Sequence, residues 1–228
     1  MANQPNTKIK AIITGATGMV GEGVLHECLL DPDVQEVLVV NRKPCGVTHT
    51  KLKEIIHDNF FDLSSIQNQF SGYNACFFCL GVTSLGKQEP EYYHLTYTLT
   101  MQAANIFCNA NPDMTFCYVS GAHTDSSEIG KVMWARVKGK TENDLMRLPF
   151  KQVFNFRPGF MLPTKGLKNA HKFYKLMNWL YPILRKFLPN SVSTLKELGL
   201  AMINVIKFGY GEKIIEVKDI HILAAKKN

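Results

Sequence analysis

Short apolar runs alternate with amphipathic stretches along most of the chain. Apolar runs of about four to eight residues predict strands buried on both faces, and apolar positions spaced about 3.6 residues apart predict helices. The strands are expected over residues 8–15, 36–41, 52–57, 75–81, 115–121 and 153–159, and the helices over 20–30, 64–70, 91–110 and 130–147. This alternation predicts an α/β fold, a doubly wound parallel sheet with helices on both faces. Such sheets bind ligands at the carboxyl ends of their strands.

The C-terminal third of the sequence mixes apolar and basic residues. Residues 167–187 carry an apolar stripe at helical spacing, interrupted at Pro182, and the stripe consists of Phe173, Leu176, Met177 and Leu180. Such a stripe suits the core or cleft of the protein, a partner surface or a membrane surface. A helix is expected over residues 193–209, between a serine or threonine cap and a terminal glycine, and a strand over 213–217.

No linker rich in glycine, serine or proline divides the sequence. Because domain boundaries usually fall in such linkers, we expect residues 1–228 to form a single domain. Within it, residues 160–228 are expected to contribute a small C-terminal lobe on the substrate side of the sheet.

Composition limits the location and the partners. The 228 residues are 46% hydrophobic and carry a net charge of +7. No apolar run approaches the roughly 18 residues of a membrane span, and the N-terminus lacks the features of a signal peptide. We therefore expect a soluble, cytoplasmic protein. Net charge alone is weak evidence for nucleic-acid binding, so no nucleic-acid partner is expected, whereas a protein partner or a homo-oligomer stays open.

The six cysteines lie mostly inside apolar runs, as buried, reduced thiols do. Cys76 and Cys79 have C-x-x-C spacing, but strand positions three apart point to opposite faces of a sheet. Because there is no second such pair and no nearby histidine pair, we interpret both as core residues and expect no metal site.

The strongest motif is "TGATGMVG", residues 14–21, which follows the first expected strand and opens the first expected helix. In this context the first glycine permits a tight turn, the second lets a pyrophosphate approach the backbone, and the third allows close helix–strand packing. The N-terminus of the helix offers free N–H groups and a partial positive charge to phosphates. We therefore expect a dinucleotide on a turn formed by Gly15, Thr17, Gly18, Met19, Val20 and Gly21.

The end of the second expected strand indicates which dinucleotide. A carboxylate at this point would hold the ribose 2′-hydroxyl of NAD, but the sequence has Asn41, Arg42 and Lys43. A guanidinium can bind a 2′-phosphate through two hydrogen bonds. NADP is therefore favoured over NAD, with the alternative that Arg42 belongs only to a surface loop.

The motifs "TGATGMVG", "CLGVT", "VSG", "VKGK" and "FRPG" occur in this order. Together they resemble the short-chain dehydrogenase/reductase superfamily, in its extended or atypical, NAD-dependent epimerase/dehydratase-like branch. More narrowly, the sequence is similar to the Tat-interacting oxidoreductase-like group. The similarity extends from the first expected strand to residues 218–226, nearly the whole chain. It implies a Rossmann fold, NAD(P) binding and an oxidoreductase activity.

The resemblance also implies cofactor contacts. Asp58 matches the acidic residue that bonds the adenine amino group. The turn that lines the adenosine ribose is matched by Leu80, Gly81 and Val82. The loop that passes the nicotinamide amide is matched by Pro158 and Gly159.

The resemblance further implies a catalytic set, with one departure. Ser120 matches the serine that holds a substrate carbonyl, and Lys138 matches the lysine that binds the nicotinamide ribose. Trp134 stands where the family has the tyrosine that exchanges a proton with the substrate. An indole is only a weak N–H donor and does not titrate in this range, so it cannot perform an acid–base cycle. The helix position of the family's relay asparagine is matched by Thr96 or a neighbour.

Other side chains are candidates for the missing acid. His123 follows the serine in "VSGAHTD" and is of a type that exchanges protons near pH 7, although an exposed loop histidine is the simpler interpretation. The tyrosine candidates, each of which also suits core packing, are Tyr92, Tyr93, Tyr97 and Tyr118.

Two functions follow from these observations. The first is an NADP(H)-dependent oxidoreductase on an unknown carbonyl-type substrate, with an acid other than Trp134. The alternative is a catalytically inactive NADP(H)-binding sensor or regulatory protein that acts through a protein partner.

Overall fold

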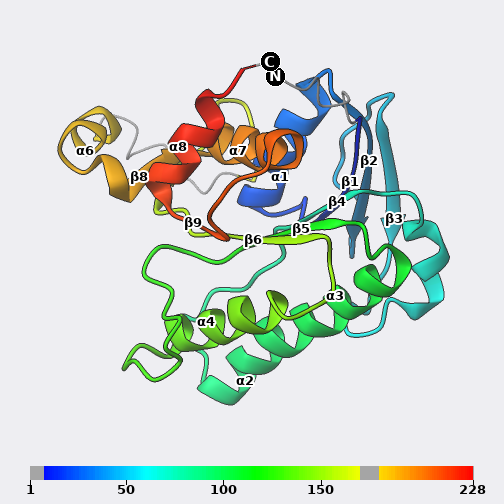
Figure 1. The fold of residues 1–228 in the computed structure, drawn as a ribbon, viewed down its shortest axis with the longest axis horizontal. Helices are drawn as coiled ribbons and strands as arrows, with labels where there is room; N and C mark the ends of the chain where they lie inside the picture. Colours follow the sequence, from blue (N-terminus) through cyan, green and yellow to red (C-terminus); the bar gives the residue numbers. More distant parts are fainter. Residues whose placement is uncertain (1–7, 170–179, 228) are drawn as a thin grey trace.

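A parallel sheet forms the middle layer of the structure, a computed structural model that describes residues 8–169 and 180–227 (Figure 1). Its strand order is β3-β2-β1-β4-β5-β6-β9, and all neighbouring strands are parallel. The strands are β1 (Ile9–Thr14), β2 (Val34–Asn41), β3 (Leu52–Ile56), β4 (Ala75–Phe78), β5 (Thr115–Val119), β6 (Gln152–Phe156) and β9 (Ile214–Ile215). The chain starts in the middle of the sheet, builds one edge and then the other, which confirms the predicted doubly wound fold.

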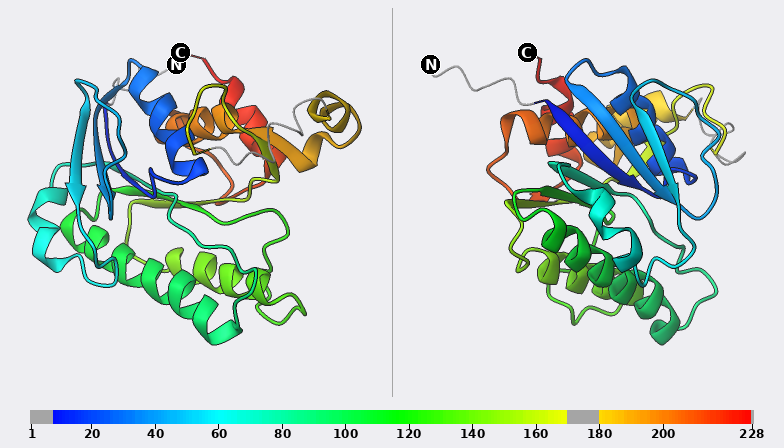
Figure 2. Two further views of the ribbon diagram at one scale, coloured as in Figure 1. Left: turned by 180° about the vertical axis from the view of Figure 1, so that it is seen from behind. Right: turned by 90° about the vertical axis from the view of Figure 1, so that its right-hand side faces the viewer.

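Helices cover both faces of this sheet (Figures 1 and 2). One face carries α1 (Met19–Leu30), α7 (Leu195–Phe208) and α8 (Val217–Ala225), and the other η1 (Ser64–Phe70), α3 (Leu99–Ala110) and α4 (Met133–Leu145). Successive strand residues face opposite helix layers. In β1, Ala11 and Ile13 face the layer of α1, α7 and α8, and Ile12 faces the layer of η1, α3 and α4. Because both faces are covered, the strands are continuously apolar, as the sequence pattern predicts.

The expected helix over residues 91–110 consists of three consecutive segments. These are α2 (Glu89–Tyr93), the π-helical turn η2 (His94–Thr98) and α3. The first segment begins after Gln88, with Pro90 in its first turn, where the missing N–H of proline costs no hydrogen bond.

The C-terminal third contains elements that the sequence pattern does not predict. Two short strands, β7 (Phe160–Leu162) and β8 (Val192–Thr194), form a separate parallel pair, and α8 is the last element of the described residues. Helix α7 begins after Thr194, whose hydroxyl accepts from the N–H of Glu197 while the Glu197 side chain accepts from the N–H of Thr194. This capping box and the C-terminal Gly209, at φ +64°, confirm the predicted boundaries of that helix.

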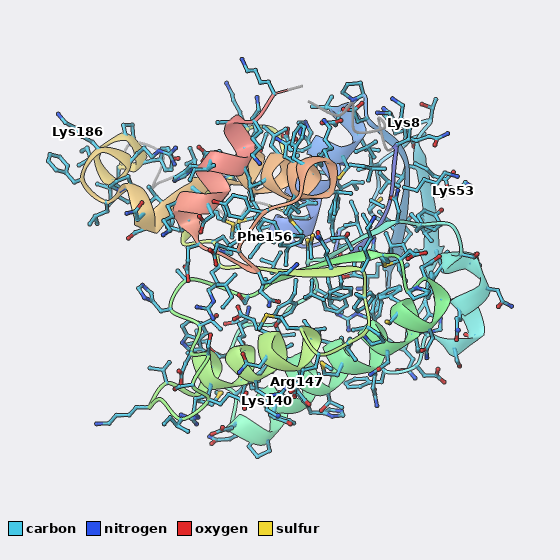
Figure 3. All side chains as sticks on the ribbon, viewed as in Figure 1. Lys8, Lys53, Lys140, Arg147, Phe156 and Lys186 are labelled. Atoms are coloured by element: carbon cyan, nitrogen blue, oxygen red, sulfur yellow. The ribbon has the colours of Figure 1, made fainter. Side chains whose placement is uncertain are left out.

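Pro182 lies in the first turn of α6 (Tyr181–Phe187), and residues 170–179 of the expected helical stretch lie outside the described residues. A proline is favoured there because its fixed φ suits the first turn of a helix. Helix α6 protrudes from the body with Lys186 at its surface, whereas Phe156 of β6 lies inside the molecule (Figure 3). Of the expected apolar stripe, Phe173, Leu176 and Met177 lie outside the described residues.

Candidate functional site

The glycine turn after β1 has the close packing that its sequence predicts. Gly15 has φ +73°, and a Cβ atom on it would lie 2.8 Å from the carbonyl oxygen of Cys79. A Cβ atom on Gly21 would overlap the carbonyl oxygen of Gly15. Gly18 is the N-cap of α1, and no side chain of the described residues caps this end of the helix. The turn therefore presents bare backbone, which suits the approach of a diphosphate.

The turn after β4 lies against this glycine turn. A Cβ atom on Gly15 would also lie 2.8 Å from the backbone nitrogen of Leu80, and the exposed Gly81 and Val82 follow. The sheet order reverses between β1 and β4, so both turns lie at the topological switch point, where doubly wound sheets bind ligands.

A cavity of about 650 Å³ opens beside the glycine turn. Its lining includes the predicted cofactor contacts Thr17, Arg42, Lys43 and Asp58, together with Pro44, Cys45, Lys168 and Asn169. Arg42 and Lys43 are exposed and have no ion-pair or hydrogen-bond partner within residues 8–169 and 180–227. Unpaired cations next to a bare backbone cradle fit the phosphates of a dinucleotide.

Lys138 of α4 contacts the carboxyl end of β5. Its Nζ atom donates to the carbonyl oxygen of Ser120 at 2.5 Å. Burial lowers the pKa of Lys138 to about 8, and the nearby carboxylate of Glu142 acts in the opposite direction. The Ser120 hydroxyl does not point toward Lys138 but donates to Oε1 of Glu142 at 2.5 Å. In this arrangement the Ser120 hydroxyl is a hydrogen-bond donor to a buried carboxylate.

Glu142 belongs to a buried charge cluster that the sequence interpretation missed. Arg157, which follows β6, donates from Nε to Oε1 of Glu142 at 3.0 Å and from Nη2 to Oε2 at 2.5 Å. The other contacts of Arg157 are with Ser126 and Glu216. Glu142 is four residues after Lys138 and therefore on the same helix face, and Arg157 stands in "FRPG" at the end of an apolar strand. These positions are the only sequence signals of the cluster.

Trp134 lies in the first turn of α4, beside the turn that follows β5. A Cβ atom on Gly121 would lie 3.8 Å from the indole ring. The helix approaches this turn closely, because a Cβ atom on Gly139 would overlap the carbonyl oxygen of Asp125. The structure thus brings Trp134 and Lys138 to the carboxyl end of β5, where the resemblance expects the catalytic pair.

A second cavity, of about 520 Å³, opens between the turns after β5 and β6. The N–H of Ala122 donates to the carbonyl oxygen of Pro158 at 2.9 Å and joins the two turns. The exposed His123, at φ +66°, lines this cavity. The other lining residues are Gly121, Ala122, Arg157, Pro158, Gly159, Phe160, Asn190, Ser191 and Glu216. His123 is therefore an acid–base candidate that faces open space.

The tyrosine candidates are engaged or enclosed. Burial raises the pKa of Tyr118 well above its ordinary value. Burial, and then the hydrogen bond to Asp144, also raise the pKa of Tyr97, and Tyr93 packs on its ring. Tyr92 is 1% exposed. High pKa values and enclosure both oppose proton exchange with a substrate.

Cys76 and Cys79 are free thiols that pack in opposite layers of the core. Within the described residues, no three histidine, cysteine or acidic side chains are placed to hold a metal ion. Over the same part of the chain, no helix has both the length and the apolar character required to cross a membrane.

No family model matches the sequence. Among curated proteins, the chain is 28% identical to the mitochondrial protein FMP52-1 of Scheffersomyces stipitis over 169 residues, which cover 71% of this chain and 73% of that protein. It is 24% identical to the mitochondrial protein FMP52 of Meyerozyma guilliermondii over 171 residues, which cover 73% and 70% of the two chains. These names state a location and no reaction.

The location of these relatives contradicts the cytoplasmic location expected from the sequence. FMP52 of Saccharomyces cerevisiae is also named as a mitochondrial protein. The expectation was wrong because it rested on a missing signal peptide and membrane span, and neither feature reports on delivery to mitochondria.

Solved structures show the fold. The UDP-N-acetylglucosamine 4-epimerase of Methanobrevibacter ruminantium M1, in complex with UDP-N-acetylmuramic acid, has a TM-score of 0.64 at 14% identity and covers 92% of this chain and 76% of its own. WbmF of Bordetella bronchiseptica, in complex with NAD+, has a TM-score of 0.63 at 12% identity and covers 97% and 78%. The chain therefore has the Rossmann fold of these solved structures.

Proposed function

We propose that this chain binds NADP(H) and is a non-standard oxidoreductase of the short-chain dehydrogenase/reductase type, acting on a carbonyl-type substrate. The observation that carries the proposal is the bare glycine turn beside a cavity lined by Arg42 and Lys43, neither of which has a partner among the described residues. The NAD-bound WbmF supports a nicotinamide cofactor, and the two cations favour its 2′-phosphorylated form. The narrower likeness to the Tat-interacting oxidoreductase-like group belongs to the same proposal.

When bound, the cofactor supplies or accepts a hydride, and the side chains of this protein orient the substrate and move the proton. Lys138 is proposed to bind the nicotinamide ribose, because its ammonium already lies at the end of β5. The cavity lined by His123 and Arg157 is proposed to receive the substrate, and His123 to exchange the proton. Trp134 is proposed to contact the substrate or the nicotinamide ring without exchanging a proton.

Calorimetric titration of the full chain with NADPH and with NADH tests the cofactor part. We expect heat of binding for both coenzymes and a lower dissociation constant for NADPH. Absence of binding to either coenzyme would overturn the proposal.

Oxidation of NADPH in the presence of a panel of aldehydes, ketones and quinones tests the enzymatic part. We expect Lys138→Ala and His123→Gln to lower the rate with an accepted substrate. Lys140→Ala is a matched control, because Lys140 lies on the same helix and pairs with Asp144 instead.

A second candidate function is an NADP(H)-binding protein without turnover. It is supported by two features of the site: the Ser120 hydroxyl is bonded to Glu142, and Trp134 stands at the tyrosine position. Such a protein would bind NADPH with a measurable affinity and oxidise it with no member of the carbonyl panel. Capture of a partner that depends on bound NADPH would then favour a regulatory role.

We further propose a mitochondrial location, by analogy with the named location of the FMP52 relatives. Imaging of the tagged full chain against a mitochondrial marker tests this, and a diffuse signal that excludes mitochondria would overturn it.

A further inference from the structure

A carboxylate on the cofactor-facing helix anchors a segment from the C-terminal third of the chain. Glu22, in the first turn of α1, accepts hydrogen bonds from the backbone N–H groups of Lys168 and Asn169, both at 2.7 Å. Each oxygen of the carboxylate takes one of the two bonds. Because the Glu22 side chain is largely buried and the bonds are charge-assisted, they fix the backbone of this segment relative to the glycine turn.

The anchored segment forms one wall of the 650 Å³ cavity. Lys168 lines the cavity together with Arg42 and Lys43, and no partner of its ammonium is found within residues 8–169 and 180–227. Among the described residues that line it, the cavity therefore collects three cations and a single carboxylate, that of Asp58. An excess of positive charge on exposed, unpaired side chains suits a doubly charged phosphate group.

The loop that carries Arg42 and Lys43 is also held by a carboxylate. Oε1 of Glu54, on β3, accepts from the backbone N–H of Cys45 at 2.8 Å and from the Asn41 side chain at 3.3 Å. These two contacts flank Arg42 and Lys43 and hold the loop that carries them. Neither Glu22 nor Glu54 is among the lining residues, so both carboxylates order a backbone segment and leave the cations free for a ligand.

We propose that Lys168 is a third ligand of the 2′-phosphate of NADP(H), positioned by Glu22, and that it contributes to the preference for NADP over NAD. This inference rests on the proposed cofactor and adds a residue from the C-terminal third of the chain to its site. This cation comes from a segment that is remote in the sequence from the Arg42–Lys43 pair but lines the same cavity.

The test is calorimetry on the full chain with two pairs of ligands that differ by one phosphate: NADPH with NADH, and adenosine 2′,5′-bisphosphate with 5′-AMP. We expect Lys168→Ala to weaken NADPH and the bisphosphate about tenfold, the effect of one charge-assisted contact, and to change NADH and 5′-AMP less than about twofold. Lys165→Ala is the matched control, because Lys165 is exposed on the same segment and does not line the cavity.

Glu22→Gln tests the positioning role, because an amide oxygen can accept from one backbone N–H but its nitrogen cannot accept from the other. We expect a smaller loss of affinity for the same two phosphorylated ligands, and faster hydrogen exchange at the amides of Lys168 and Asn169. Lys165→Ala should leave the exchange at these two amides unchanged.

The outcomes separate this inference from the proposed function. If the natural chain binds neither NADPH nor NADH, the proposed cofactor is wrong and the role of Lys168 is wrong with it. If the natural chain prefers NADPH and Lys168→Ala keeps that preference in full, the proposed cofactor stands and the role of Lys168 is overturned. Equal weakening of NADPH and NADH by Lys168→Ala would also overturn a role at the 2′-phosphate.

Discussion

The first turn of α1 packs directly on the turn that precedes it, so that a Cβ atom on Gly21 would overlap the carbonyl oxygen of Gly15. We expect Gly21→Ala to lower the free energy of unfolding by about 2 kcal/mol or more, because overpacking against backbone forces the helix to shift. The same shift should weaken binding of NADPH. Urea denaturation and calorimetry measure the two effects.

Gly18→Ala is the informative counterpart. A Cβ atom on Gly18 would lie 3.4 Å from the carbonyl oxygen of Gly15, a tolerable contact, so we expect a loss of only about 0.5–1 kcal/mol from the less favourable cap. Its affinity for NADPH should nevertheless fall, since the methyl group occupies the path of the pyrophosphate. Equal stability of the Gly21→Ala protein and the natural protein would contradict the described packing.

Lys138 should make cofactor binding depend on pH. Because burial lowers its pKa to about 8, the ammonium is protonated at pH 7 and largely neutral at pH 9. A neutral amine is a weaker donor, so we expect the dissociation constant for NADPH to rise as the pH passes through about 8. In Lys138→Arg this inflection should be absent, because a guanidinium stays charged over the whole range.

The lowered pKa of Lys138 also determines how the stability of the protein changes with pH. The unfolded lysine loses its proton near pH 10.4, so between about pH 8 and 10.4 the unfolded chain holds the additional proton. The contribution of Lys138 to the free energy of unfolding should therefore increase with pH in that window.

An inflection in NADPH binding that Lys138→Arg retains would mean that another group titrates.

Loss of the buried Glu142–Arg157 ion pair should lower the free energy of unfolding more than loss of an exposed pair. Glu142 is fully buried, and its removal leaves the guanidinium of Arg157 without its main partner. We expect Glu142→Ala to lower the free energy of unfolding by about 3–5 kcal/mol. Glu91→Ala, which breaks an exposed pair with Lys87, should cost less than about 1 kcal/mol. Similar unfolding midpoints in urea for the two variants would show that the buried pair is not intact in solution.

Trp134→Tyr should reveal whether the missing acid limits turnover. If no side chain of the natural protein exchanges the proton, a tyrosine hydroxyl here should raise the rate of NADPH oxidation about 100-fold, the usual contribution of a general acid, whereas an enzyme that uses His123 as the acid should gain much less. Trp134→Phe provides the control for ring size without a hydroxyl and should show no such increase. A lower rate in both variants would instead assign a substrate contact to the indole.

The sheet is the part of the fold that sequence predicts best. Each central strand is an apolar run, because both of its faces are covered, and the glycine turn has a local signature. Strand ends are harder to place: the strand expected over 75–81 ends at Phe78, where the chain turns beside Gly15. The short strands β7 and β8 escape prediction because three residues are too few to show a period.

The charged residues of the site are less predictable than its glycines. Glu22, Glu142 and Arg157 each gain their role from partners remote in the sequence, and their own neighbours do not distinguish them from surface charges. Ser120 illustrates the same limit, since its position at the end of β5 was predictable and the direction of its hydroxyl was not. Which residues line a cavity depends on tertiary structure and cannot be predicted from local sequence. In the sequence, Lys168 is therefore only one of many basic residues.

The anchor between Glu22 and Lys168 joins positions 146 residues apart. Contacts of such long range are slow to form, so we expect the 650 Å³ cavity to be complete only after the segment that carries Lys168 has docked. A coenzyme that binds in this cavity would bind only fully folded molecules and would, by mass action, stabilise them against unfolding. The supply of coenzyme in a compartment would then help to set the lifetime of this protein against proteolysis, as well as its activity.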